Sequence, residues 1–100
     1  MYTYYPYPAN DGKHKYYIIT ASGKTVYFGA YNYNDYLIYY RDYGKEYADK
    51  NKRAYIARHK VNEEKFWNNP DYPSYWSKNL LWNKSTLQAS YNDIKNKLLI

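Results

Sequence analysis

The stretch KYYIITASGKTVYFGA, residues 15–30, decides the fold. Its two runs, residues 15–20 and residues 24–30, are rich in β-branched and aromatic side chains, which favour strands. The three residues between them, 21–23 (ASG), have the length and chemistry of a tight hairpin turn. Gly29, near the end of the second run, indicates a bulge or a close approach of another chain segment. The stretch therefore predicts an antiparallel β-hairpin.

Before the hairpin, residues 1–12 form a segment rich in tyrosine and proline. Pro6 and Pro8 each lack a backbone donor, so the segment is predicted to be an extended arm or an edge strand and not a central strand. Residues 10–12 (NDG) are a turn signal at its end. Tyrosine rings give a large contact area at low entropic cost, which suits partner binding. The candidate partner-binding residues of this arm are Tyr2, Tyr4, Tyr5 and Tyr7.

After the hairpin the pattern changes to helices. Residues 31–43 (YNYNDYLIYYRDY) leave two interpretations open, a short helix capped by Asn34 or Asp35 and a third strand. Helical character begins at Gly44, and Asp49 is expected to cap a helix of residues 49–60, where its carboxylate would complement the helix dipole.

The last part of the chain carries two further helix signals. Pro73 is suited to the first position of a helix. Residues 85–88 (STLQ) match a capping box, and the apolar side chains that follow recur at helical spacing. The stripe consists of Leu87, Tyr91, Ile94 and Leu98. This pattern predicts a docked amphipathic helix at the end of the chain.

Together these elements predict an α+β fold, a small single domain with an N-terminal β-hairpin or sheet followed by three to four short α-helices. The domain is expected to span residues 13–100, after the extended Tyr/Pro-rich arm of residues 1–12. The chain has no cysteine, so packing must hold it together. One sheet face would pack the helices and the other would be free for a partner. The predicted structural core is Phe28, Tyr55, Ile56, Trp76, Leu80, Trp82, Leu87 and Ile94.

Basic residues concentrate in one segment. Residues 41–60 hold seven Lys or Arg and three Asp or Glu, which accounts for +4 of the net charge of +6. Helical spacing puts Lys50, Arg53 and Lys60 on one face. Such a segment, with tyrosines beside it, suits contact with a phosphate backbone, and the alternative is a solvated helix face. The candidate anion or nucleic-acid contacts are Lys50, Lys52, Arg53, Arg58 and Lys60.

Tyrosine is the other unusual feature of the composition, with 18 of 100 residues. Interfaces favour tyrosine, since one end of its ring is apolar and the other end is polar. AT-rich codon usage is an alternative explanation for the abundance of Tyr, Lys, Asn and Ile. No apolar run reaches the length of a membrane span.

The chain offers no recognisable catalytic set. The two histidines, His14 and His59, have no second His or Cys at ligand spacing, so no metal site is expected. Glu63 and Glu64 are adjacent, which does not set two carboxylates across a cleft. The string at residues 23–25 (GKT) resembles the end of a phosphate-binding loop, but Ile18 stands where its first glycine would be. The chain is therefore expected not to be an enzyme and to need no cofactor.

Four separated motifs carry a family resemblance. They are GKTVYFG (residues 23–29), NDY (residues 34–36), RAYIARH (residues 53–59, with Glu63 just beyond) and YWSKNLLWNK (residues 75–84). In this order they resemble a family of small uncharacterised proteins of nucleocytoplasmic large double-stranded DNA viruses, over about residues 13–95. The chain departs from the pattern at Ser74-Tyr75, since a glycine commonly precedes the tryptophan-serine string in the family.

The resemblance implies a viral origin and no assigned reaction. It leads us to expect a virion structural protein, a minor capsid or capsid-associated protein that cements larger shell proteins from the inner side, with the host cytoplasm as its place during assembly. Its partners would be other capsid proteins. The alternative is a basic viral protein that binds nucleic acid through residues 41–60. In the motifs, Arg58 is expected to pair with Asp35 or Glu63.

Overall fold

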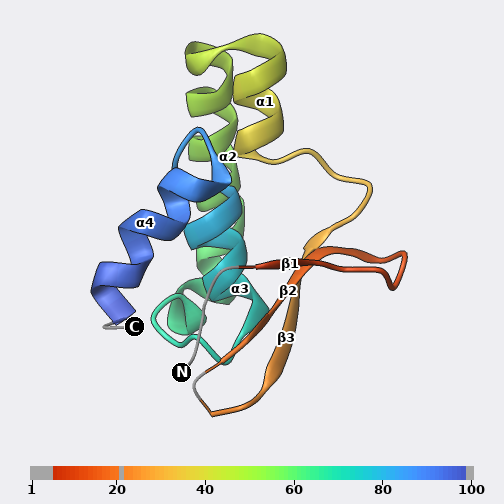
Figure 1. Cartoon of the computed structure of the whole chain (residues 1–100). Coiled ribbons are helices and arrows are strands. Elements are labelled where there is room, and N and C mark those ends of the chain that lie inside the picture. Colours follow the sequence, from red (N-terminus) through yellow and green to blue (C-terminus); the bar gives the residue numbers. More distant parts are fainter. Residues whose placement is uncertain (1–5, 21, 99–100) are drawn as a thin grey trace.

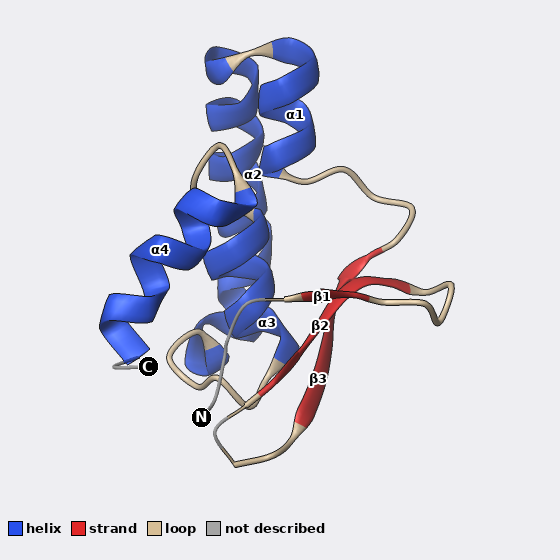
Figure 2. Ribbon diagram, in the orientation of Figure 1, coloured by secondary structure: helices blue, strands red, loops and turns tan. Residues whose placement is uncertain are grey.

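The computed structural model describes the backbone of residues 6–20 and 22–98 and the side chains up to Lys95. A small antiparallel sheet is followed by helices that lie on one side of it (Figures 1 and 2). In chain order the elements are β1 (Tyr7–Pro8), β2 (His14–Ile19), β3 (Thr25–Ala30), α1 (Tyr36–Tyr43), α2 (Lys45–Glu63), the 3₁₀ turn η1 (Glu64–Phe66), α3 (Pro73–Trp76), the π-helical turn η2 (Ser77–Leu81) and α4 (Leu87–Leu98). This architecture confirms the predicted α+β class.

The sheet has the strand order β1-β2-β3, and the predicted hairpin is β2-β3. Tyr7 and Pro8 pair with β2, so this part of the N-terminal segment is an edge strand of the sheet and not a free arm. A proline is tolerated there because an edge strand needs only half of its backbone donors. The other three candidate residues of the arm, Tyr2, Tyr4 and Tyr5, lie outside the described residues.

The ambiguous residues 31–43 contain a helix, α1, and no strand. Asp35 caps it, since its Oδ1 accepts the backbone N–H of Ile38 at 3.1 Å. The prediction that helical character begins at Gly44 is confirmed, since α2 starts directly after it, but the predicted cap at Asp49 is wrong because the helix begins four residues earlier. Gly44 has a φ of 92°, a left-handed conformation that lets the chain reverse between two packed helices. Asp49 therefore lies inside α2.

Inside the α1–α2 pair, Asp49 joins the two helices. It accepts hydrogen bonds from the Tyr36 hydroxyl and from Lys45 Nζ, each at 2.6 Å. Tyr36 is buried, and burial together with this carboxylate raises the pKa of its phenol to about 12. The Tyr36 hydroxyl therefore keeps its proton well above its ordinary pKa, and it donates this proton from α1 to Asp49 of α2.

We expect the free energy of unfolding to fall as the pH rises from 10 to about 12. The unfolded chain loses the Tyr36 proton near its ordinary pKa of 10, while the folded chain keeps it up to about 12, so the stabilisation is complete below pH 10 and is lost above it. Urea titrations at several alkaline pH values test this. Tyr36→Phe should show a shallower decline over that range, and an unchanged slope would contradict the assignment.

Two predicted helix starts in the last third of the chain have different outcomes. Pro73 is the first residue of α3, as predicted. The predicted capping box at residues 85–88 is wrong by one position. The hydroxyl of Thr86 accepts the N–H of Ala89 at 3.1 Å, and the amide of Gln88 donates to Asn92 instead of reaching back. Ser85 and Thr86 are both residue types that cap helices, so the local sequence does not distinguish them. The path of the chain after η2 places Thr86 directly before α4.

The core lies between the sheet and the helices. Of the predicted members, Phe28, Tyr55, Trp76, Leu80, Trp82 and Ile94 are buried, while Ile56 and Leu87 are half-buried and pack against them. Leu81, which belongs to the YWSKNLLWNK motif and was also expected in the core, is buried as well. Buried apolar residues that the prediction left out are Ile18, Val26, Tyr36, Ala48 and Tyr75. Three of these five come from the sheet and from α1, so the core extends across the sheet and the helices.

Candidate functional site

The face of the sheet that points away from the helices carries a row of tyrosines. Strand alternation sends Ile18 and Phe28 into the core and Tyr17 and Tyr27 to the opposite face. The register places Tyr7, Tyr17 and Tyr27 side by side on three neighbouring strands. Their ring centroids are 5.2 Å and 5.4 Å apart, within stacking distance. We call these three residues the tyrosine ladder.

The tyrosine ladder is open to solvent at both ends. Tyr7 is 41% exposed and Tyr27 is 39% exposed, and the neighbouring Ile19 is 40% exposed. Of these residues only Tyr7 was a candidate from sequence. Tyr17 and Tyr27 could have been found, since a turn centred on residues 21–23 places them opposite each other.

The strand connection beside the tyrosine ladder is held by an acidic cap. Asp11 accepts the backbone N–H groups of Lys13 and His14, and His14 Nδ1 lies 2.7 Å from Asp11 Oδ2. The hydrogen bond from His14 and those from the backbone keep the pKa of the Asp11 carboxyl well below its ordinary value. The His14 ring also contacts Tyr27, with centroids 5.6 Å apart. The β1-β2 connection is therefore fixed next to the tyrosine ladder.

The five candidate anion contacts do not form one surface. Lys50, Arg53 and Lys60 are exposed on one face of α2. Lys52 points the other way, where its Nζ donates to the carbonyl of Asn83 at 3.0 Å and burial lowers its pKa. Arg58 lies on a third side of the helix and lines a cleft. Helical rotation of 100° per residue separates them, so at most three could touch one phosphate backbone.

Much of the positive charge of residues 41–60 is neutralised locally. Three of the segment's basic side chains form ion pairs with carboxylates close by in the sequence. The nitrogen–oxygen distances are 2.8 Å for Arg41 with Asp42, 2.6 Å for Lys45 with Asp49 and 3.5 Å for Lys60 with Glu64. Within the part of the chain that the structure describes, Lys50, Arg53 and Arg58 have no ion-pair partner. This favours the interpretation of the segment as a solvated helix face.

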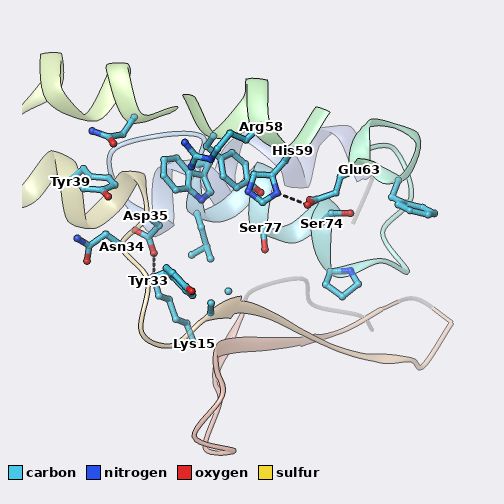
Figure 3. Close-up of a pocket in the computed structure, with 18 of the residues that line it drawn as sticks. Lys15, Tyr33, Asn34, Asp35, Tyr39, Arg58, His59, Glu63, Ser74 and Ser77 are labelled. Carbon is cyan, nitrogen blue, oxygen red and sulfur yellow. Dashed lines mark hydrogen bonds and ion pairs between the residues drawn. The ribbon is translucent and has the colours of Figure 1, made fainter. Parts of the chain in front are cut away.

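A cleft of about 760 Å³ lies between α2, the loop after β3 and the α3–η2 segment. Arg58 and His59 of α2 form one side, and Tyr33 and Lys15 lie across from them (Figure 3). Side chains of Leu81 and Trp82 also line the cleft. These residues belong to segments that lie far apart in the sequence, and tertiary packing brings them together at this site.

Three rings form a stacked row along the α2 side of the cleft. The Tyr55 ring lies between two other rings. The Trp82 ring is nearly parallel to it, with centroids 4.4 Å apart, and the His59 ring centroid is 4.3 Å away. Tyr55 is only 6% exposed. Burial, and then the negative charge of Glu63, raises the pKa of its phenol, so the hydroxyl keeps its proton.

Two ion pairs flank the row of rings, and neither is the one expected. Asp35, which is buried, pairs with Lys15 Nζ at 2.7 Å, and Glu63 pairs with His59 (Figure 3). The expectation that Arg58 takes one of these carboxylates is wrong. Lys15 reaches Asp35 by passing over Gly29, where a missing side chain leaves room, and His59 reaches Glu63 because the two are one helical turn apart.

The cleft holds one pair that resembles part of a catalytic set. His59 with Glu63 resembles a base held by an orienting carboxylate, and Ser74 and Ser77 line the same cleft. However, neither serine hydroxyl is hydrogen-bonded to His59 among the described residues, so no nucleophile is paired with the base there. The described part of the chain also holds no group of three His, Cys, Asp or Glu side chains that could bind a metal ion.

In comparisons with protein-family models, curated proteins and solved structures, nothing matches this chain. Among the described residues, no helix combines the length and the apolar character that crossing a membrane requires. The function must therefore be inferred from the tyrosine ladder, the cleft and the exposed face of α2 that carries Lys50, Arg53 and Lys60.

Proposed function

We propose that the chain is a virion structural protein, a minor capsid or capsid-associated protein that binds a larger shell protein through the tyrosine ladder. The single observation that carries the proposal is the solvent-facing row of Tyr7, Tyr17 and Tyr27 across the sheet. The family resemblance of the four sequence motifs supplies the viral setting.

The tyrosine ladder suits a protein partner for two physical reasons. Each ring offers an apolar face and a hydroxyl, which matches the mixed polarity of interfaces. Strand pairing and ring stacking hold the rings in place before binding, so little side-chain entropy is lost on association. A partner that covers the ladder would also cover the exposed Ile19.

Binding of nucleic acid is the second candidate function, and it rests on the exposed face of α2. Lys50, Arg53 and Lys60 could contact phosphates there. With single-stranded DNA, two to three phosphate contacts would make the slope of log K against log salt about −1.4 to −2.1. A protein contact through tyrosines should change little with salt. Fluorescence anisotropy with labelled single-stranded DNA over a salt series separates these two candidates.

We expect the protein to be a stoichiometric component of purified particles, and the double variant Tyr17→Ser/Tyr27→Ser to be depleted from them. A reduction of about tenfold or more in copy number is expected, which corresponds to about 1.4 kcal/mol of lost binding. The measurement is quantitative mass spectrometry against the major capsid protein, after infection with virus that carries the variant.

Tyr31→Ser is the matched control, because Tyr31 is 63% exposed and lies outside the ladder. It should be incorporated like the wild type. Circular dichroism and urea unfolding of the isolated variants check that the sheet is intact. Absence of the wild-type protein from particles would overturn the virion proposal, and normal incorporation of the double variant would overturn the role of the tyrosine ladder.

A further inference from the structure

The cleft between α2 and the loop after β3 has the size of a ligand site. Its volume of about 760 Å³ lies within the range of roughly 300–1,000 Å³ that small-molecule sites occupy. Six aromatic rings besides His59 contribute to its lining, and they come from separate elements and loops of the chain. They are Tyr33, Tyr39, Tyr55, Phe66, Tyr72 and Trp82. Such a lining favours a ligand with a planar aromatic body.

One hydroxyl of the cleft has no partner among the described residues. Tyr55 as a residue is only 6% exposed, and its hydroxyl makes no hydrogen bond within the described chain. In that part of the chain the buried polar atom left without a partner is Trp67 Nε1 and not the Tyr55 hydroxyl, so solvent reaches this hydroxyl. A ligand acceptor would replace that solvent. Because Tyr55 keeps its proton, the hydroxyl is a donor.

One cation of the cleft is also unpaired. Of the three basic side chains that line it, Lys15 is paired with Asp35 and His59 with Glu63, whereas Arg58 has no ion-pair partner among the described residues. Its guanidinium presents donors in the fixed geometry that matches a carboxylate or a phosphate. Arg58 is exposed on the α2 side of the cleft, next to His59 (Figure 3).

We propose that this cleft binds a planar aromatic molecule that carries one carboxylate or phosphate group. The anionic group would pair with Arg58, and the ring would pack on Trp82 and Leu81. The Tyr55 hydroxyl would donate to an acceptor on the ligand. This site is separate from the tyrosine ladder, which lies on the opposite face of the sheet, so either can fail without the other.

Isothermal titration with two matched pairs of probes tests the proposal on the whole chain. The first pair, adenosine monophosphate and adenosine, differs by a phosphate group. The second pair, N-acetyl-tryptophan and its amide, differs by a carboxylate. We expect the charged member of at least one pair to bind about tenfold more tightly than its neutral partner, as one charge-assisted bidentate contact provides. The pair that shows the difference identifies the source of the anionic group.

Two variants and one control locate the binding. Arg58→Gln should remove the preference for the charged probe, and Tyr55→Phe should weaken binding about fivefold while keeping the ring stack. Arg53→Gln, on the exposed face of the same helix, should change neither. Equal binding of charged and neutral probes, no binding of any probe up to millimolar concentration, or equal effects of Arg58→Gln and Arg53→Gln would overturn the proposal.

Discussion

Trp76→Ala should lower the free energy of unfolding by about 3–5 kcal/mol, the loss typical of a large aromatic side chain removed from a core. Trp76 is fully buried at the end of α3, where it is packed among core residues of the sheet and helices. Its indole N–H donates to the carbonyl of Pro70 at 2.7 Å, so the substitution also leaves that carbonyl without its partner. The cavity and the lost hydrogen bond act in the same direction.

Urea unfolding followed by circular dichroism measures this loss. A domain of this size has a total stability of about 5–15 kcal/mol, so the loss expected for Trp76→Ala is a large part of it. Trp67→Ala is the control of the same residue type, since Trp67 is only half-buried and its indole N–H has no hydrogen-bond partner. It should cost clearly less. Equal losses in the two variants would contradict the place of Trp76 at the centre of the core.

Gly29→Ala should destabilise the protein by about 2–5 kcal/mol, because backbone strain and overpacking add. Gly29 has a φ of 78°, where residues with a Cβ are strained. A Cβ there would also lie 2.7 Å from Leu81 Cδ1 and 3.3 Å from the Cβ of Lys15. Leu81 is buried, so its Cδ1 can yield only toward the cleft that it lines. Both β3 and the cleft should therefore be disturbed.

Gly23→Ala separates these two contributions. Gly23 has a similar φ of 85° in the turn, but nothing lies within 4 Å of the position a Cβ would take. Gly23→Ala should therefore lower the free energy of unfolding only by the cost of backbone strain, about 1–2 kcal/mol. Urea titrations of both variants give the difference, which is the cost of the contact with Leu81. If the two losses were the same, Leu81 would not constrain Gly29.

Features that depend on neighbours in sequence were predictable. The hairpin follows from residues 15–30, since strand preference and turn chemistry are both local. Pro73 starts its helix because the ring fixes φ and needs no donor. The predicted caps at Asp49 and Ser85 were wrong. The helix α2 begins after Gly44, which makes no side-chain cap hydrogen bond, whereas α4 is capped by Thr86, a residue type that also suits this position.

The candidate sites were less predictable than the fold. Positions of the basic residues along α2 followed from the helical repeat, but the partner of Lys52 did not, since its Nζ donates to the backbone carbonyl of Asn83, 31 residues away. The pair between Asp35 and Lys15 required the path of β2 past Gly29. Only side-chain packing could show that Arg58 lacks a partner and faces a cleft.

The sequence by itself determined the α+β class, the hairpin, about half of the buried core and the exposed basic face of α2. These depend on periodicity and local propensity, which are properties of short windows. The tertiary structure alone decided that Tyr7 completes a ladder with Tyr17 and Tyr27, and that Tyr55, Arg58 and Trp82 share a cleft with the loop after β3. The physical reason is that such sites join residues far apart in the chain, and only the packing of helices on the sheet sets which of them meet.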